Sequence, residues 1–248
     1  MPASIKATIQ LTVGCDPELT VIDEHRNFLN AYNYFKFQSS FGLDGNESIA
    51  ELRPGYSESP VQLTAKIWKL LKIAHEKYPN IGFLAGHYQC GYPIGGHIHI
   101  GMSMKDDSIA NDLTHQLDFT VGTFSDLTDD LNQRERRRKT GYGIPGAWRS
   151  QSHGLEYRTP GSWLLSPSIA LANLTLAKIA ALNFKVKQFD FKSLLLTKSS
   201  PKSFIQGLLE ESNISVPEDC KFGLQQASLL VDKKIDWNQN ILPNWGIS

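Results

Sequence analysis

The stretch Gly95-Gly96-His97-Ile98-His99-Ile100-Gly101 decides how the fold is predicted. Side chains alternate between the two faces of a strand, so His97 and His99 share one face and the two isoleucines share the other. The flanking glycines leave room for a ligand or another backbone to come close. Alone, this pattern fits a solvated strand face as well as a metal site. The interpretation therefore depends on what the other strands carry.

Three further predicted strands place charged groups two residues apart in the same way. They are Ile9–Ile22 with Asp16 and Glu18, Glu47–Arg53 with Glu51 and Arg53, and Leu155–Thr159 with Glu156 and Arg158. If these strands lie beside the histidine strand, like charges meet within a few ångströms and need cations between them. Carboxylates with an imidazole suit Mg²⁺ or Mn²⁺ better than structural zinc, and arginines on the same face suit phosphoryl transfer. The residues thus predict a metal and nucleotide site on an antiparallel sheet.

The rest of the chain alternates between helical stripes and loops. Ser59-Pro60 and Ser166-Pro167 are helix-start signals, the second before a helix that is apolar around most of its circumference. We expect one continuous amphipathic helix over Ile109–Leu131, finishing in the basic run Arg134–Lys139. Pro17 predicts a sheet edge or a bulge. The remaining expectations are a hairpin return at Phe28–Tyr34, a strand at Ile81–Ala85, a loop at Gly86–Pro93 and helices at Ser200–Leu209 and Leu224–Val231.

Composition limits the classes of function and the organisation. The chain has 248 residues with 25 basic and 25 acidic side chains, which gives no general attraction to nucleic acid or to an anionic membrane. No apolar run approaches the length that a bilayer needs, and the first residues lack a secretion signal, so we expect a cytoplasmic protein. Cys15, Cys90 and Cys220 are predicted to be reduced thiols, with Cys15 and Cys90 packed inside. We expect a catalytic domain over residues 1–188 and a small helical appendage over 189–248. The oligomeric state stays open.

Four motifs, in this order along the chain, resemble a known family. They are Gly14-Cys15-Asp16-Pro17-Glu18, Gly42-Leu43-Asp44-Gly45 leading to Glu51-Leu52-Arg53-Pro54, the histidine stretch, and His153-Gly154-Leu155-Glu156-Tyr157-Arg158 with the residues after it. Over roughly residues 11 to 170 the chain is similar to the phage-type carboxylate-amine ligases, which are amidoligases related to glutamine synthetase and glutamate-cysteine ligase. The resemblance implies an α+β, glutamine-synthetase-like domain. Its curved antiparallel sheet would bind ATP and Mg²⁺ or Mn²⁺ on the concave face and carry helices on the convex face.

The same resemblance implies roles for single residues. The metal ligands would be Asp16, Glu18, Glu51, His97 and Glu156, although the proline inside the first acidic pair departs from the Glu-x-Glu of better-known relatives. Nucleotide phosphates would be held by His97, His99, Arg138, Lys139 and Arg158. The catalytic contacts to substrate would come from Arg53, Arg149 and Arg158. Either Arg53 or Arg149 would bind the acceptor carboxylate through two parallel hydrogen bonds.

The implied reaction is ATP-dependent formation of an amide or isopeptide bond, in which a carboxylate is phosphorylated to an acyl phosphate and an amine displaces the phosphate. Substrates would be small-molecule or peptide carboxylates and amines in the cytoplasm, the host's if the chain is phage-encoded. Two alternatives remain. The same fold could transfer phosphate directly to a guanidino nitrogen, or the chain could be a non-catalytic metal- and nucleotide-binding phage module.

Overall fold

An antiparallel sheet forms the centre of the computed structural model, which describes residues 11–45, 47–103, 106–187, 200–228 and 235–248. The strand order is β10-β11-β9-β1-β4-β3, and β2, β5 and β6 also pair with β1. The bounds are β1 Thr12–Ile22, β2 Phe28–Leu29, β3 Phe41–Leu43, β4 Ala50–Leu52, β5 Tyr56–Ser57, β6 Gly82–Leu84, β9 Gly96–Gly101, β10 Trp148–Gln151 and β11 Gly154–Tyr157. The predicted α+β class with a large antiparallel sheet is confirmed.

Strand β1 lies in the middle of the sheet, so the prediction that Pro17 marks an edge or a bulge is wrong. Pro17 pairs with Gly96 of β9 on one side. On the other side β5 ends its pairing at Gly14 and β4 begins at Glu18. The N–H of Glu18 is donated towards β9, to the carbonyl of Gly95. Because donors alternate along a strand, the donor that proline lacks would point into the interval between β5 and β4.

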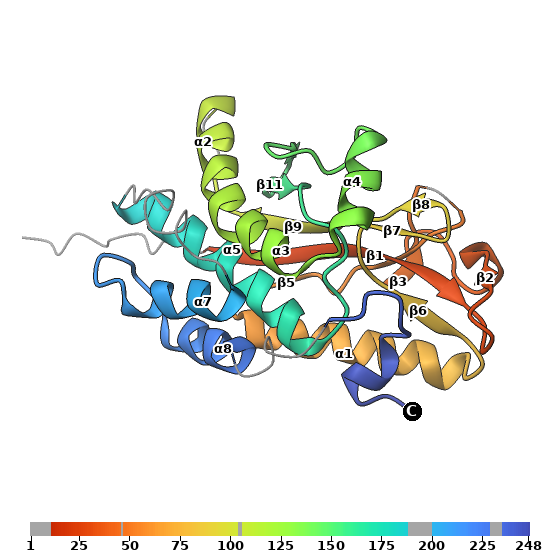
Figure 1. Cartoon of the computed structure of the whole chain (residues 1–248). Helices are drawn as coiled ribbons and strands as arrows, with labels where there is room; N and C mark the ends of the chain where they lie inside the picture. The colour runs from red at the N-terminus through yellow and green to blue at the C-terminus, as the bar shows by residue number, and fades with distance from the viewer. Residues whose placement is uncertain (1–10, 46, 104–105, 188–199, 229–234) are drawn as a thin grey trace, which may run out of the picture.

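Helices lie on both sides of this sheet. Their bounds are α1 Pro60–Lys77, α2 Asp107–Leu117, α3 Thr123–Thr128, α4 Leu131–Lys139, α5 Pro167–Lys187, α7 Pro201–Glu210 and α8 Glu218–Ser228, with short 3₁₀ turns η1 Ala31–Asn33 and η3 Leu242–Trp245. In Figure 1, α1, α7 and α8 lie together on one side of β1 and β9, and α5 packs against α1, α2, α8 and β9. The core-facing residues of β1 and β9 include Val13, Leu19, Ile98 and Ile100, all fully buried. The residues between them therefore face the opposite side.

The expected continuous helix over Ile109–Leu131 is interrupted twice. After α2 the backbone forms a π-helical turn, η2, over Asp118–Gly122, and α3 ends at Asp129, whose backbone is extended. The side chain of Asp130 then caps a separate helix, α4, which contains the basic run. Leu131 is 56% exposed and does not continue the apolar stripe. The apolar spacing in the sequence therefore continued past the point where α3 ends and α4 begins, and it predicted one helix where there are two.

Two smaller expectations also need correction. Within the predicted loop Gly86–Pro93, strands β7 (Tyr88–Gln89) and β8 (Tyr92–Pro93) form a hairpin. Its turn residues, Cys90 and Gly91, both have positive φ, as a two-residue hairpin turn requires. Cys90 at this tip is exposed, whereas Cys15 and Cys220 are buried. The prediction that Cys90 packs inside is therefore wrong.

The C-terminal helices share the core of the rest of the chain. Phe204, Leu208, Leu224 and Trp245 belong to the same cluster of buried residues as the sheet, and the indole of Trp245 donates to the carbonyl of Leu164 at 2.7 Å. The predicted domain boundary at 188–189 touches the undescribed residues 188–199, and the division into two domains stays a prediction. Helix α8 begins before the predicted Leu224, and the end of that prediction also falls outside the described residues.

Helix α5 contains a window that could cross a membrane by length and composition. This window, Pro167–Phe184, has a mean hydropathy of 1.2 over 18 residues, and it is the one such helix found among the described residues. The expectation that no apolar run reaches this length is therefore wrong. Of the window, 78% is buried inside the protein, and a core helix passes the same test.

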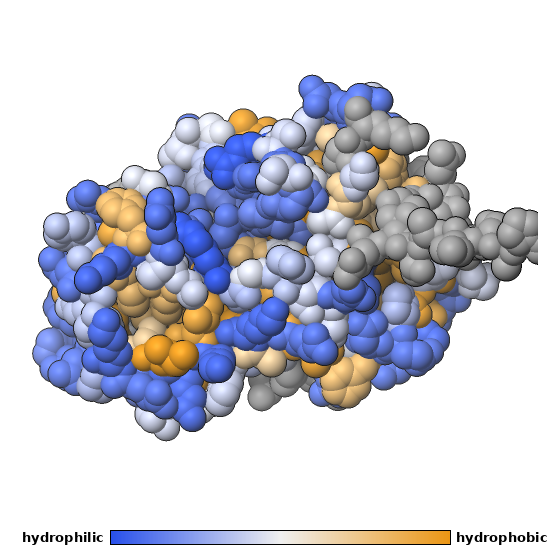
Figure 2. All heavy atoms as spheres, turned by 180° about the vertical axis from the view of Figure 1, so that it is seen from behind, coloured by the Kyte–Doolittle hydropathy of each residue, from blue (hydrophilic) through white to orange (hydrophobic). Residues whose placement is uncertain are grey.

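The surface away from the core is mixed in character. Seen from behind, it is hydrophilic over most of its area, and apolar residues gather in a few patches separated by polar ones (Figure 2). Large hydrophobic side chains that remain exposed include Tyr32, Phe37, Tyr56, Ile73 and Phe222. Scattered apolar exposure of this kind is ordinary for a globular protein.

Helix α1 offers a direct test of the local sequence signals. The hydroxyl of Ser59 accepts from the N–H of Gln62 at its start, and Pro60 stands at its first position. Ser59→Ala removes this acceptor and is expected to lower the free energy of unfolding by about 1 kcal/mol. Urea denaturation measures the change, and Ser59→Asp is the control because it keeps an acceptor. Equal losses in both variants would contradict a capping role.

Candidate functional site

The register of the sheet brings the four charged motifs together. Strands β11, β9, β1 and β4 are consecutive neighbours. Asp16 lies opposite His97, Glu18 lies opposite Glu51, and Glu156 lies opposite His99. All of these side chains face away from the hydrophobic core, since their neighbours in sequence fill it. The condition on which the predicted site depends, that these strands lie side by side, is therefore met.

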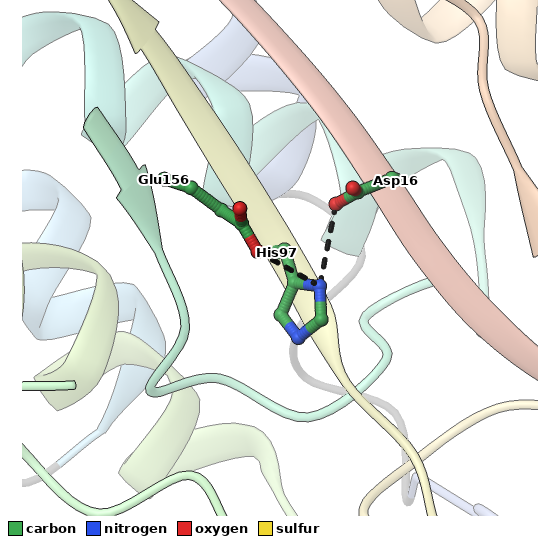
Figure 3. Close-up of side chains that lie close together, drawn as sticks. All are labelled: Asp16, His97 and Glu156. Carbon is green, nitrogen blue, oxygen red and sulfur yellow. Dashed lines mark ion pairs between the residues drawn. The ribbon is translucent and has the colours of Figure 1, made fainter. Parts of the chain in front are cut away.

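Asp16, His97 and Glu156 form the tightest group on this face. Each presents one potential ligand atom, and these atoms all lie within 4.8 Å of one another. Figure 3 shows the three side chains converging from β1, β9 and β11, with Nδ1 of His97 between the carboxylates. Nδ1 is 3.3 Å from Asp16 Oδ1 and 3.6 Å from Glu156 Oε1. Within the described part of the chain, Asp16 Oδ1 is buried without a hydrogen-bond partner.

Glu18 is held on two sides in a buried position. The backbone N–H of Gly95 donates to its Oε2 at 2.6 Å, and the hydroxyl of Tyr142 donates to its Oε1 at 2.9 Å. The same hydroxyl lies 2.5 Å from Nε2 of His97. Sequence reasoning placed Tyr142 only in a glycine-rich loop and missed this role. An aromatic residue between Gly141 and Gly143 was the available signal, because both glycines adopt positive φ.

Glu156 is fully buried and is surrounded by donors. Arg149 forms a fork with it, Nε to Oε2 at 2.8 Å and Nη2 to Oε1 at 3.0 Å. Arg158 Nη1 donates to Oε1 at 2.6 Å, and Gln151 Nε2 donates to Oε2 at 2.5 Å. Two predicted catalytic arginines therefore meet a predicted metal ligand. Gln151 is an additional contact that the sequence analysis did not name.

Glu51 and Arg53 form a separate ion pair at the edge of the cluster. Arg53 Nη2 contacts Glu51 Oε2, and it also donates to the carbonyl of Leu43 at 2.8 Å. Glu51 is opposite Glu18 across the two strands, so two buried carboxylates face each other. Like charges placed directly opposite in a sheet repel. The guanidinium of Arg53 offsets this repulsion on the Glu51 side.

His99 faces a cavity on the other side of Asp16. Its Nε2 is 3.0 Å from Asp16 Oδ1, and its Nδ1 is 2.9 Å from Nε2 of His153, on which the ring stacks. The cavity has a volume of about 460 Å³. It is lined by Thr12, Gly14, Tyr56, His99, Gly101, Met102, Ser103 and His153. His153 is a second residue whose place at the site was missed.

The basic run at the end of α4 contributes a different residue from those predicted. Arg138 lies near Asp126 at 3.5 Å, and Lys139 is exposed. Arg137 instead points inward and is fully buried. Its guanidinium donates to the carbonyl of Thr159 at 2.7 Å and lies 4.2 Å from the ring centroid of Tyr142. The structure thus brings Arg137 to the cluster and leaves Arg138 and Lys139 outside it.

Asp118, the first residue of the π-helical turn η2, ties the glycine-rich loop to the end of β11. Its Oδ2 accepts from the N–H of Gly146 at 2.7 Å. Its Oδ1 accepts from the hydroxyls of Tyr157 at 2.7 Å and Thr159 at 3.1 Å. π-Turns inside helices are frequent at functional sites. Here the turn aims one carboxylate at the two segments that carry Tyr142 and Arg158.

Burial and neighbouring charges move the carboxylate pKa values in opposite directions. Burial raises the pKa of Asp16, but the adjacent imidazoles of His97 and His99 outweigh it and hold that pKa well below its usual range. For Glu18 burial dominates, and its pKa is raised. Burial also raises the pKa of Glu156, yet Gln151, His97 and Arg149 lower it below the ordinary value. A face on which carboxylate pKa values separate in this way is typical of functional sites.

A comparison with protein-family models agrees with the motifs. A family model described as "Phage phiEco32-like COOH.NH2 ligase-type 2" matches residues 13–210. A search of curated proteins found no match. Similar solved structures include "Crystal structure of novel glutamine synthase homolog", 10% identical, covering 90% of this chain and 66% of the other, with a TM-score of 0.49. Another is "Apo GmaS without ligand", 14% identical, covering 89% and 66%, with a TM-score of 0.41.

The match to the family model runs from the start of β1 through α7 and includes all four motifs. The chain spans about two thirds of the length of the two solved structures. The chain belongs to the family of phage phiEco32-like carboxylate-amine ligases of type 2.

Proposed function

We propose that the protein is an ATP- and Mg²⁺-dependent ligase that joins a carboxylate to an amine through an acyl phosphate. The observation that carries this proposal is the carboxylate and imidazole cluster beside Arg149 and Arg158 on one face of the sheet, in a chain of this family. The carboxylate oxygen of one substrate would attack the γ-phosphate of ATP and release ADP. The amine would then attack the acyl carbon, and phosphate and a proton would leave.

The residues present fit a hard divalent cation. Asp16 Oδ1 is buried without a hydrogen-bond partner among the described residues, and it faces the same point as His97 Nδ1 and Glu156. Oxygen donors with one imidazole suit Mg²⁺ or Mn²⁺. Asp16, His97 and Glu156 would hold one ion, and Glu18 with Glu51 would hold a second. When bound, such ions neutralise charge on phosphate oxygens.

The arginines and the cavity supply the remaining parts. Arg158 and Arg149 would move part of their hydrogen bonding from Glu156 to anionic oxygens of the phosphate and the acceptor carboxylate. Arg53, at the other end of the cluster, is the alternative fork for that carboxylate. The cavity beside His99 and His153 is large enough for part of a nucleotide, which supports a role for His99 in binding ATP. Its position next to Asp16 would place phosphates at the metal ligands.

Metal binding by Asp16 gives the first test of this proposal. Asp16→Asn keeps the size of the side chain and removes its charge, so Mn²⁺ affinity measured by titration calorimetry is expected to fall about 100-fold. The rise in melting temperature with Mn²⁺ and ATP is expected to disappear as well. Asp126→Asn, at a half-exposed carboxylate paired with Arg134, is the matched control and should bind like the wild type. Unchanged affinity in Asp16→Asn would remove the metal site from this face.

Product analysis separates the ligase from the two alternatives. Purified protein with ATP and Mg²⁺ is mixed with panels of amino acids, polyamines and dipeptides, and ADP and new masses are measured. ADP release that needs both an amine and a carboxylate, with a product lighter by one water than their sum, supports the ligase. A phosphorylated guanidino compound without an amide supports phosphotransfer. Nucleotide binding without turnover across the panels supports a binding module.

A further inference from the structure

The hydroxyl of Tyr142 contacts two of the candidate metal ligands, Glu18 and His97. It donates to Glu18 Oε1 at 2.9 Å and lies 2.5 Å from Nε2 of His97. Glu18 and His97 are both buried, so neither contact is exchanged freely with water. The second oxygen of Glu18 is occupied by the N–H of Gly95. Every polar atom in this short chain of contacts therefore has an assigned partner.

With Glu18 ionised and His97 neutral, counting protons along these contacts gives the tautomer of His97. An ionised carboxylate only accepts hydrogen bonds, and a phenol has a single proton to donate. If Tyr142 gives that proton to Glu18, its oxygen must accept from His97, and the imidazole proton stands on Nε2. The other ring nitrogen agrees with this assignment. Nδ1 is 3.3 Å from Asp16 and 3.6 Å from Glu156, longer than normal hydrogen bonds of a ring N–H.

Tyr142 is held rigidly in the orientation that this assignment needs. The buried guanidinium of Arg137 lies 4.2 Å from its ring centroid and is itself fixed by the carbonyl of Thr159. Gly143 allows this approach, because a Cβ there would overlap the guanidinium. Gly95 leaves room for the contact between Tyr142 and His97, because a Cβ there would lie 2.5 Å from the hydroxyl and 2.6 Å from Nε2 of His97. The ring is thus held by a fixed cation, and the absence of a side chain at Gly95 leaves room for the hydroxyl.

We propose that Tyr142 is a positioning residue that locks His97 in the Nε2–H tautomer and so presents the Nδ1 lone pair to the point between Asp16 and Glu156. The inference rests on the proposed function only in naming that point a divalent-cation site. A partner on the second ring nitrogen commonly orients a metal-binding histidine. In this chain that partner is the hydroxyl of Tyr142, which is itself hydrogen-bonded to the buried carboxylate of Glu18.

Nitrogen NMR of the metal-free protein tests the tautomer directly. In protein labelled with ¹⁵N-histidine and treated with a chelator, His97, assigned by its loss in His97→Gln, is expected to show a protonated Nε2 and an unprotonated Nδ1. In Tyr142→Phe, which keeps the ring against Arg137, the signals should move towards a mixture of tautomers. Tyr32→Phe, at an exposed tyrosine on η1, is the matched control and should leave His97 unchanged. A protonated Nδ1 in the wild type overturns the inference.

Metal titration of the same proteins separates this inference from the proposed function. Tyr142→Phe is expected to weaken Mn²⁺ binding about tenfold, and Mg²⁺ should shift the Nδ1 signal of the wild type while Nε2 keeps its proton. Gly95→Ala, which crowds both the hydroxyl and Nε2 of His97 at their contact, should disturb the tautomer in the same direction. Tight metal binding together with a protonated Nδ1 refutes the role of Tyr142 and leaves the ligase standing. The expected tautomer without any metal binding supports Tyr142 and refutes the proposed metal site.

Discussion

Glu156→Gln is expected to lower the affinity for Mn²⁺ by about 100-fold or more and to lower the free energy of unfolding by about 3–5 kcal/mol. The new amide places two N–H donors where Arg149, Arg158 and Gln151 already donate, so donors face donors in a fully buried position. Calorimetry measures the affinity and urea denaturation measures the stability. Glu135→Gln, at an exposed glutamate of α4, is the matched control.

The loss of stability in Glu156→Gln should depend on pH, because the pKa of Glu156 is lowered in the folded protein. A carboxyl whose pKa is lower in the folded state stabilises the protein at pH above its unfolded pKa of about 4.3. That contribution is lost as the pH falls through the lower folded value. With a chelator present, the difference in free energy of unfolding between the wild type and Glu156→Gln should therefore become smaller as the pH falls below about 4.3. A difference independent of pH would show that charge at Glu156 contributes nothing to the fold.

Arg137→Ala is expected to lower the free energy of unfolding by about 3–5 kcal/mol, which for a chain of this size is a fall in melting temperature on the order of 10 °C. The substitution leaves a cavity at a fully buried position. It also removes the donors to the carbonyls of Thr159 and Arg158 and the support under the ring of Tyr142. Scanning calorimetry measures the change.

Arg138→Ala is the control for this experiment, since Arg138 is the next residue and lies on the outer side of α4 near Asp126. It should change stability by less than about 1 kcal/mol and leave Mn²⁺ binding as it is. Variants of Arg137 and Arg138 also decide which of these two residues contributes to nucleotide binding. If Arg138→Ala weakened binding of ATP and Mn²⁺ while a folded Arg137→Lys did not, the nucleotide contact predicted at Arg138 would be correct and the inward role of Arg137 would be wrong.

The sheet and most helices follow from local signals in the sequence. Period-two alternation defines β9 and β11, and Ser-Pro pairs mark the starts of α1, α5 and α7. Pro17 was misplaced because a proline carries no information about its neighbours on either side of the strand. It is accommodated in a central strand by an interval between β5 and β4, which only the tertiary structure defines. The break before α4 was missed because apolar spacing continued across it.

For the site, the sequence identified which strands carry charge, and the register then placed the residues opposite one another. Residues that reach the cluster from loops and helix ends were harder to find. Arg137, Arg138 and Lys139 are adjacent cations, and only the direction of α4 decides which of them is buried. Tyr142 reaches Glu18 and His97 from a loop that is distant in the sequence, and Gln151 reaches Glu156 from the neighbouring strand. No spacing rule along the chain encodes such contacts.

The π-helical turn at Asp118–Gly122 makes this part of the chain sensitive to length. Removing one residue from the turn would restore regular helical hydrogen bonding but would rotate one side of it by about 100° relative to the other. Asp118 could then no longer reach both Gly146 and Tyr157. Single-residue deletions between α2 and α3 should therefore be tolerated worse than substitutions there. In an alignment of related chains, a gap at this point would signal a rearranged glycine-rich loop.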